Sequence, residues 1–187
     1  MNVAIIGSGS WATALAKIVM HNATDINWYI RKQETIDEFV EIRRNPNHLE
    51  WAYFDVSRIH FSADINAVIE QSDLLVLAVP SPYLKQSLND IKVDMSNKMV
   101  ISAVKGMIPD ENLLVTEYMH QYFQVPKENL GVIAGPCHAE EIALERLSCR
   151  TVGCKDMQKA IEWSKLLDTP YVRTPPSDDV EGREYAS

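Results

Sequence analysis

Short apolar runs alternate with amphipathic segments along most of this chain. The run at 73–79 is continuously apolar after Asp73, which is typical of a parallel strand buried on both faces. The other segments that read as strands lie at 3–6, 26–30, 59–62, 99–104, 130–134, 150–153 and 171–173. Six segments are predicted to be helices, from helical spacing of apolar positions or from a polar, helix-compatible composition. They are 10–19, 35–43, 63–71, 115–123, 137–145 and 155–167.

A glycine turn lies between the first predicted strand and the first predicted helix. Residues 7–12 read Gly-Ser-Gly-Ser-Trp-Ala, a G-x-G-x-x-A pattern. Gly7 would permit a tight turn, Gly9 would let a pyrophosphate approach the backbone, and Ala12 would let the helix pack close to the strand. Free N–H groups at the helix start would then bind the phosphates. The alternative is an ordinary strand–helix turn that binds nothing.

The alternation predicts an α/β fold. We expect a Rossmann-like, doubly wound, mostly parallel sheet with helices on both faces, spanning residues 1–176. Right-handed crossovers place a ligand crevice at the carboxyl ends of the strands. Distinctive segments follow five predicted strands there: the glycine turn, Arg31, 80–83, 105–106 and 135–137.

Composition narrows the possible partners. The net charge is −8 without a long basic run, so nucleic acid is not an expected partner. No apolar stretch is long enough for a membrane span, and no signal peptide is recognisable. Three cysteines without a C-x-x-C pair predict free thiols in a reducing cytoplasm. His138 and Glu140 form an H-x-E pattern, but the P-C-x-x-C of zinc deaminases is missing, so no metal site is expected.

The last residues suggest the start of another helix. Residues 177–181 carry capping candidates and acidic side chains, as a first helical turn does. No glycine, proline or basic last turn follows before Ser187. The pattern alone leaves open whether a helix is cut off here or the tail is frayed.

Several motifs in order resemble the NAD(P)-dependent glycerol-3-phosphate dehydrogenase family, over residues 3 to about 184. They are the glycine turn, Asn45-Pro46 with Leu49, Val79-Pro80-Ser81, Lys105-Gly106, the G-P-x-x-A-x-E pattern of 135–141, and residues 179–184. The resemblance implies a cofactor domain, NAD(P)H as cofactor and a phosphorylated small molecule as substrate. It also implies an all-helical second domain, absent here, which begins with the helix at 177–187. The family's general acid/base lysine is expected beyond Ser187, so no catalytic residue is assigned within the chain, which we expect to be inactive alone.

The resemblance and the chemistry of the residues together suggest cofactor contacts. Ser10 and Trp11 open the first helix beside the expected pyrophosphate, although Trp11 could equally be a core aromatic. Arg31 and Lys32 stand where NAD-selective proteins carry an acid, and a guanidinium suits a 2′-phosphate. The alternative for this pair is a solvated surface. Tyr83 could wall the nicotinamide ribose, or pack at a helix start.

The resemblance also suggests substrate contacts. Lys105 ends a buried strand, where its charge requires an anion. The family assigns it to both substrate and cofactor, and the alternative is a solvent-facing strand cap. Gly135 and Cys137 are expected to bind substrate, and Ala139 the cofactor, through N–H groups at a helix start. A Cys137 side-chain contact is doubtful because a thiol is a weak donor. His138 is expected to be a helix-surface residue.

The implied reaction is interconversion of dihydroxyacetone phosphate and sn-glycerol 3-phosphate by hydride transfer with NAD(P)H. One alternative is the cofactor domain of another two-domain dehydrogenase acting on a hydroxy acid or ketopantoate. Another is a nucleotide-sensing module without catalysis. A homodimer is a candidate assembly for the full-length protein. The sequence leaves the preference between NADH and NADPH open.

Overall fold

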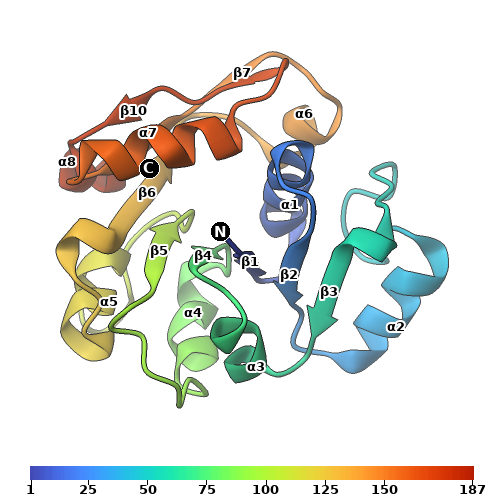
Figure 1. The fold of residues 1–187 in the computed structure, drawn as a ribbon, viewed down its shortest axis with the longest axis horizontal. Helices are drawn as coiled ribbons and strands as arrows, with labels where there is room; N and C mark the ends of the chain where they lie inside the picture. The colour runs from blue at the N-terminus through green and yellow to red at the C-terminus, as the bar shows by residue number, and fades with distance from the viewer.

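The computed structural model describes residues 1–187. Its main sheet has eight strands in the order β10-β8-β6-β5-β4-β1-β2-β3 (Figure 1). The sheet strands are β1 (Val3–Ile6), β2 (Ile26–Tyr29), β3 (Ile59–Ser62), β4 (Leu74–Leu77), β5 (Met99–Ser102), β6 (Leu130–Ala134), β8 (Thr151–Cys154) and β10 (Pro176–Ser177). A second sheet pairs β7 (Ser148–Cys149) with β9 (Val172–Arg173).

Helices cover both faces of the sheet. They are α1 (Ser10–Asn22), α2 (Gln33–Ile42), α3 (Ile65–Glu70), α4 (Ser81–Leu88), α5 (Val115–Phe123), α6 (Ala139–Ala143), α7 (Met157–Leu167) and α8 (Val180–Tyr185), with 3-10 turns at Val56–Arg58 and Lys127–Asn129. Helices α1, α6 and α7 lie on one face, and α3, α4 and α5 on the other (Figure 1). Each face of the sheet has its own apolar core. Val3 and Ile5 of β1 belong to the core on the α1 side, and Ala4 and Ile6 belong to the core on the α4 side.

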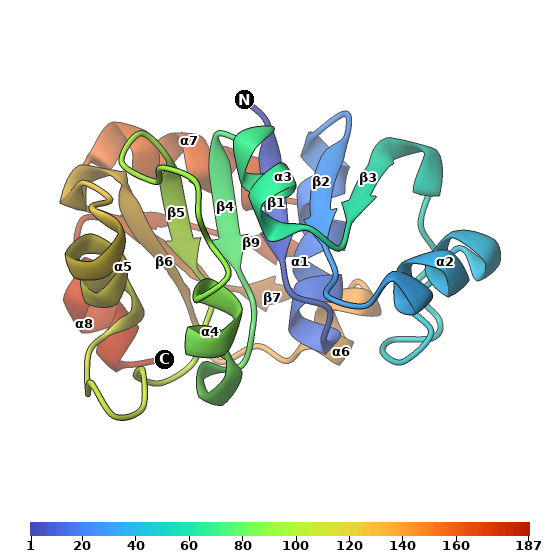
Figure 2. The same ribbon diagram turned by 90° about the horizontal axis from the view of Figure 1, so that it is seen from below.

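Six neighbouring strands are parallel, in the order β3-β2-β1-β4-β5-β6 (Figure 2). This order places the crossover reversal between β1 and β4, where nucleotides bind in doubly wound folds. Strand β8 is antiparallel to β6, with Val132 opposite Gly153. The predicted Rossmann-like, mostly parallel architecture is therefore confirmed.

Some elements differ from the sequence pattern. Helix α4 is not among the helices that the sequence pattern predicts. It begins at Ser81, and Pro82 stands in its first turn, where the missing N–H is tolerated. Helix α6 covers 139–143 rather than 137–145, since His138 is its N-cap and Glu141 accepts from the His138 N–H. Strands β7 and β10 have two residues each, too few for a periodic signal.

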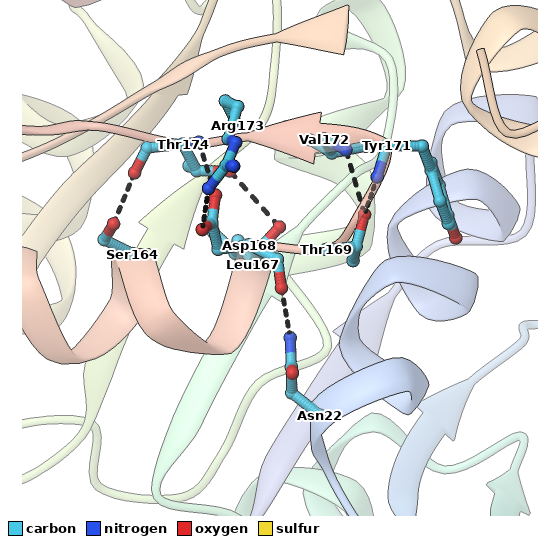
Figure 3. Close-up of polar contacts among 9 residues, drawn as sticks. All are labelled: Asn22, Ser164, Leu167, Asp168, Thr169, Tyr171, Val172, Arg173 and Thr174. Atoms are coloured by element: carbon cyan, nitrogen blue, oxygen red, sulfur yellow. Dashed lines mark hydrogen bonds and ion pairs between the residues drawn. The ribbon is translucent and has the colours of Figure 1, made fainter. Parts of the chain in front are cut away.

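A polar network fixes the connection after α7 (Figure 3). The Asn22 amide, at the end of α1, donates to the carbonyl oxygens of Leu166 and Asp168. The Asp168 carboxylate accepts from the Thr174 N–H at 3.0 Å. The Thr174 hydroxyl donates to Leu167 at 3.2 Å. These bonds hold β9, and through it β7, against the α1 side of the molecule.

The last helix packs on the main sheet. Val180 of α8 is buried, and the Glu184 carboxylate accepts hydrogen bonds from the N–H and the hydroxyl of Thr116 in α5. Burial is the main cause that raises the pKa of Glu184 above its ordinary value. The domain division after residue 176 stays a prediction.

Candidate functional site

The glycine turn joins β1 to α1 under tight constraint. Gly7 has φ +129°, and a Cβ there would lie 2.7 Å from the Ala78 carbonyl oxygen. The buried Trp28 indole N–H donates to the Gly7 carbonyl at 2.7 Å. Only glycine fits this conformation and this contact, as the sequence pattern predicts.

The start of α1 faces open space. Gly9 is its N-cap residue, and no side chain caps the helix there. A Cβ on Gly9 would meet nothing within 4 Å. The first N–H groups of a helix have no intrahelical partner and carry the positive end of its dipole. This end of α1 is therefore shaped to receive an anion, and a diphosphate fits the arrangement.

The loop after α2 closes over the glycine turn. The fully buried Asn45 amide donates to the Ser8 carbonyl and to the Thr13 hydroxyl, both at 2.9 Å. His48 Nδ1 lies 3.1 Å from the Ser10 hydroxyl. The sequence indicates only a family motif here, Asn45-Pro46 with Leu49, and predicts no contact for this loop. The signal in the sequence that could have indicated these contacts is Asn45 itself, a polar residue that precedes a proline within the family motif.

A cavity of about 330 Å³ lies at the carboxyl ends of the strands. Four chain segments line it: Ser10 and Trp11 at the start of α1, residues 78–82 after β4, 103–105 after β5, and 137–139 after β6. The carboxyl ends of β4, β5 and β6 thus meet the start of α1, as the topology requires. Of the predicted residues, the cavity brings together Ser10, Trp11, Lys105, Cys137 and Ala139.

Trp11 both lines the cavity and supports its wall. Its indole N–H donates to the Ala103 carbonyl at 2.9 Å. The Arg150 guanidinium lies over the other side of the ring, 3.7 Å from the centroid. Trp11 therefore packs against the interior and also faces the cavity, and its contact with a cofactor stays a prediction.

Lys105 stands at the cavity rim. Strand β5 ends at Ser102, so Lys105 is exposed and forms no ion pair. The exposure fits the alternative of a solvent-facing residue, because the chain has already left the sheet, and the contact with substrate and cofactor stays a prediction. Its ammonium group is nevertheless free beside the cavity.

The segment after β6 forms the opposite wall. Cys137 is buried, and its thiol donates to the Cys149 carbonyl at 3.1 Å. The thiol is thus bonded to the backbone of Cys149, while residues 137–139 line the cavity. His138 is exposed, as expected, but it also lines the cavity. Gly135 precedes this segment and is not among the lining residues.

Arg31 and Lys32 line a second hollow, of about 350 Å³, on the other side of the glycine turn. Both side chains are exposed, and neither forms an ion pair. The other lining residues are Ser8, Ile30, Thr35, Asn47 and His48. The two hollows therefore flank the start of α1, an arrangement that suits the two halves of a dinucleotide.

Tyr83 does not join either hollow. Its side chain is 63% exposed in α4, so the expectation of a packed aromatic is wrong. Ser81 and Pro82 of the same helix line the main cavity instead.

The structure shows no group of His, Cys, Asp and Glu side chains that could hold a metal ion. All three cysteines are free, with Cys149 alone exposed. No helix has both the length and the apolarity needed to cross a bilayer.

Comparisons with known proteins agree on one family. A family model described as the N-terminus of NAD-dependent glycerol-3-phosphate dehydrogenase matches residues 2–160. A glycerol-3-phosphate dehydrogenase [NAD(P)+] of an Exiguobacterium species is 30% identical over 186 residues, which are 98% of this chain and 54% of the relative. A second relative, from Oceanobacillus iheyensis, is 29% identical over 97% of this chain and 53% of its own.

Solved structures agree as well. Glycerol-3-phosphate dehydrogenase from Plasmodium falciparum superposes with a TM-score of 0.84 at 27% identity, covering 96% of this chain and 53% of the other. The Coxiella burnetii enzyme gives a TM-score of 0.82 at 22% identity, over 95% and 54% of the two chains, and supports the fold alone. The chain spans about half the length of the curated relatives it matches.

Proposed function

Because this chain belongs to the NAD-dependent glycerol-3-phosphate dehydrogenase family, as its N-terminal NAD-binding domain, we propose that it serves an enzyme interconverting dihydroxyacetone phosphate and sn-glycerol 3-phosphate. The observation that carries the proposal is the cavity beside the uncapped start of α1, lined from three strand ends. A cavity of this size is in the range of ordinary ligand pockets. The bound cofactor would supply or accept the hydride.

The chain's own residues would hold the cofactor along the carboxyl edge of the sheet. Gly7 and Gly9 open the backbone around the start of α1, whose N–H groups would bind the diphosphate. Arg31 and Lys32 would hold the adenosine side, with the Arg31 guanidinium suited to a 2′-phosphate. His48 belongs to the loop that lines this hollow, and its ring nitrogen lies beside the Ser10 hydroxyl. It is therefore a further candidate for contact with a phosphate.

The main cavity would hold the nicotinamide and the substrate. Trp11 would form one wall, and Ala139 would lie against the cofactor. Because Tyr83 is exposed, we propose that it contacts the cofactor only at the edge of the site. The Lys105 ammonium would pair with the substrate phosphate, a contact worth about 1.5–3 kcal/mol for a charged hydrogen bond. Gly135 and Cys137 would contribute through the backbone, because the Cys137 thiol is bonded to Cys149.

The proton on the substrate oxygen requires an acid at a suitable place. Lys105 and His138 are the nitrogen acids that line the cavity. A lysine beside a phosphate keeps its proton and acts as a fixed charge. The family resemblance places the general acid/base lysine in a segment following Ser187. We therefore expect the 187-residue polypeptide to show no measurable turnover of dihydroxyacetone phosphate with reduced cofactor.

Two alternatives to this function remain. A cofactor domain of a different two-domain dehydrogenase would bind a hydroxy acid or ketopantoate in place of a phosphorylated ketone. A sensing module would bind the dinucleotide without a substrate.

We further propose a cytoplasmic location, which suits three free cysteines, and a homodimer for the full-length protein.

Calorimetric titration tests the proposal and separates the alternatives. The chain is titrated first with NADPH and NADH, and then, saturated with cofactor, with dihydroxyacetone phosphate and with ketopantoate. We expect dinucleotide binding at one site per chain, and a weak further signal from the phosphorylated ketone that Lys105→Ala removes. A signal from ketopantoate alone would favour the other dehydrogenase, and no dinucleotide binding would contradict the proposal.

A further inference from the structure

Arg150 is a buried cation without an acidic partner. Only 3% of its surface is exposed. It appears in none of the six ion pairs, and its Nε has no hydrogen-bond partner. Burial lowers the pKa of the guanidinium to about 10, so the group is still charged at neutral pH. Buried charges are ordinarily paired, because an unpaired one costs stability.

The guanidinium contacts one residue from each of two walls of the main cavity. Its central carbon lies over the Trp11 ring, 3.7 Å from the centroid, within the range of a cation–π contact. Its Nη2 donates to the Cys137 carbonyl. Trp11 and Cys137 both line the cavity, whereas Arg150 does not. One side chain therefore joins the wall from α1 to the wall that follows β6.

The backbone around Arg150 is held independently of these contacts. Its N–H donates to the Arg173 carbonyl at 2.8 Å, next to the pairing of β7 with β9. Strand β9 is in turn fixed to the end of α7 and to Asn22 by the network around Asp168 and Thr174 (Figure 3). The guanidinium thus extends from a braced segment, and that segment does not depend on the guanidinium for its own position.

We propose that Arg150 is a positioning residue that sets the Trp11 ring and the Cys137 peptide at the spacing needed for the ligand. This rests on the proposed function, since the ligand is the dinucleotide. The cation also lies 3.7 Å from the centroid of a ring that lines the cavity, so it adds positive potential to a wall that faces an anionic ligand. A side chain that only supported the fold would not need a charge here, because an apolar group of similar length would fill the space without the desolvation cost.

Substitution of Arg150 should affect stability and binding differently. Arg150→Met removes the charge and the donor but keeps an unbranched chain. Its free energy of unfolding should equal or exceed that of the wild type. NADPH should bind about tenfold more weakly, because the Trp11 ring and the Cys137 peptide lose the side chain that joins them and the wall loses its positive potential. Arg150→Lys keeps the charge but lacks the planar fork, so it should recover only part of the affinity. Arg146→Met is the matched control, because that arginine is exposed and four residues away.

Two further measurements exclude a general structural effect. The indole N–H resonance of Trp11, assigned by its loss in Trp11→Phe, should shift in Arg150→Met without ligand, while the other indole resonances stay in place. In Arg150→Ala, sub-denaturing guanidinium chloride should restore part of the NADPH affinity, and sodium chloride at equal ionic strength should not.

The outcomes are distinct. If the wild type binds NADPH and Arg150→Met binds it equally well, the positioning role is refuted and the proposed function stands. Reduced stability of Arg150→Met with an unmoved Trp11 resonance would also refute the role, in favour of a structural one. If the wild type binds no dinucleotide, the proposed function fails first and Arg150 has no ligand to position.

Discussion

Substitutions at Gly7 and Gly9 should have opposite consequences, although the two glycines are only two residues apart. Gly9 has φ −79° and ψ −173°, values open to any residue, and its Cβ would point into open space. Gly9→Val should therefore cost about 1 kcal/mol or less, the penalty of a poorer N-cap. Gly7→Ala forces a Cβ to within 2.7 Å of a backbone oxygen at φ +129°. Strain of this kind costs about 1–3 kcal/mol for each feature.

For NADPH binding the order is reversed, and Gly9→Val should be the more damaging substitution. The open space at Gly9 is where a diphosphate would approach the uncapped N–H groups of α1. Loss of two charge-assisted hydrogen bonds, at about 1.5–3 kcal/mol each, corresponds to at least a hundredfold weaker binding. Gly7→Ala, where it remains folded, should bind far better than Gly9→Val because its change lies on the buried side of the turn.

Urea denaturation and calorimetric titration with NADPH measure the two effects separately. We expect a near-normal unfolding midpoint and no measurable binding for Gly9→Val, and a clearly lowered midpoint for Gly7→Ala. A folded Gly9→Val that binds NADPH as the wild type does would refute the assignment of the glycine turn to the cofactor.

Three other changes test neighbouring contacts. Arg31→Ala should weaken NADPH binding about tenfold and NADH binding little, by titration, and equal losses would exclude a 2′-phosphate role. Trp28→Phe should lower the free energy of unfolding by about 2 kcal/mol, because the Gly7 carbonyl loses its buried donor; an unchanged midpoint would show that this bond contributes nothing. The raised pKa of Glu184 means that the folded state holds this proton more tightly, so its contribution to stability is full below about pH 4.5 and declines as the pH rises through the folded-state value. Wild type should therefore lose stability relative to Glu184→Gln between pH 4 and pH 7.5, and a constant difference would contradict the shift.

The sheet was predictable because its strands carry strong local signals. Continuous apolar runs define β4 and β6, and the glycine turn fixes where β1 ends and α1 begins. Once the strands are parallel, topology alone brings their carboxyl ends together. The meeting of Trp11, Lys105 and Cys137 in one cavity follows from that rule.

Contacts between loops were not predictable in the same way. Asn45 reaches Ser8, and Arg150 reaches Trp11, across long stretches of sequence without any periodic pattern. Arg150 falls within a predicted strand, where nothing distinguishes a buried cation from an exposed one. Which alternative holds for Lys105 was not predictable for a related reason: the pattern gives the strand but not the residue at which the chain leaves the sheet.

The most direct measurement of the central claim is a crystal structure of the chain with NADPH. We predict the diphosphate at the N-terminus of α1 beside Gly9, the 2′-phosphate near Arg31, and the nicotinamide in the cavity lined by Trp11 and Lys105. A dinucleotide bound elsewhere on the molecule, with the start of α1 free of phosphate, would contradict the account.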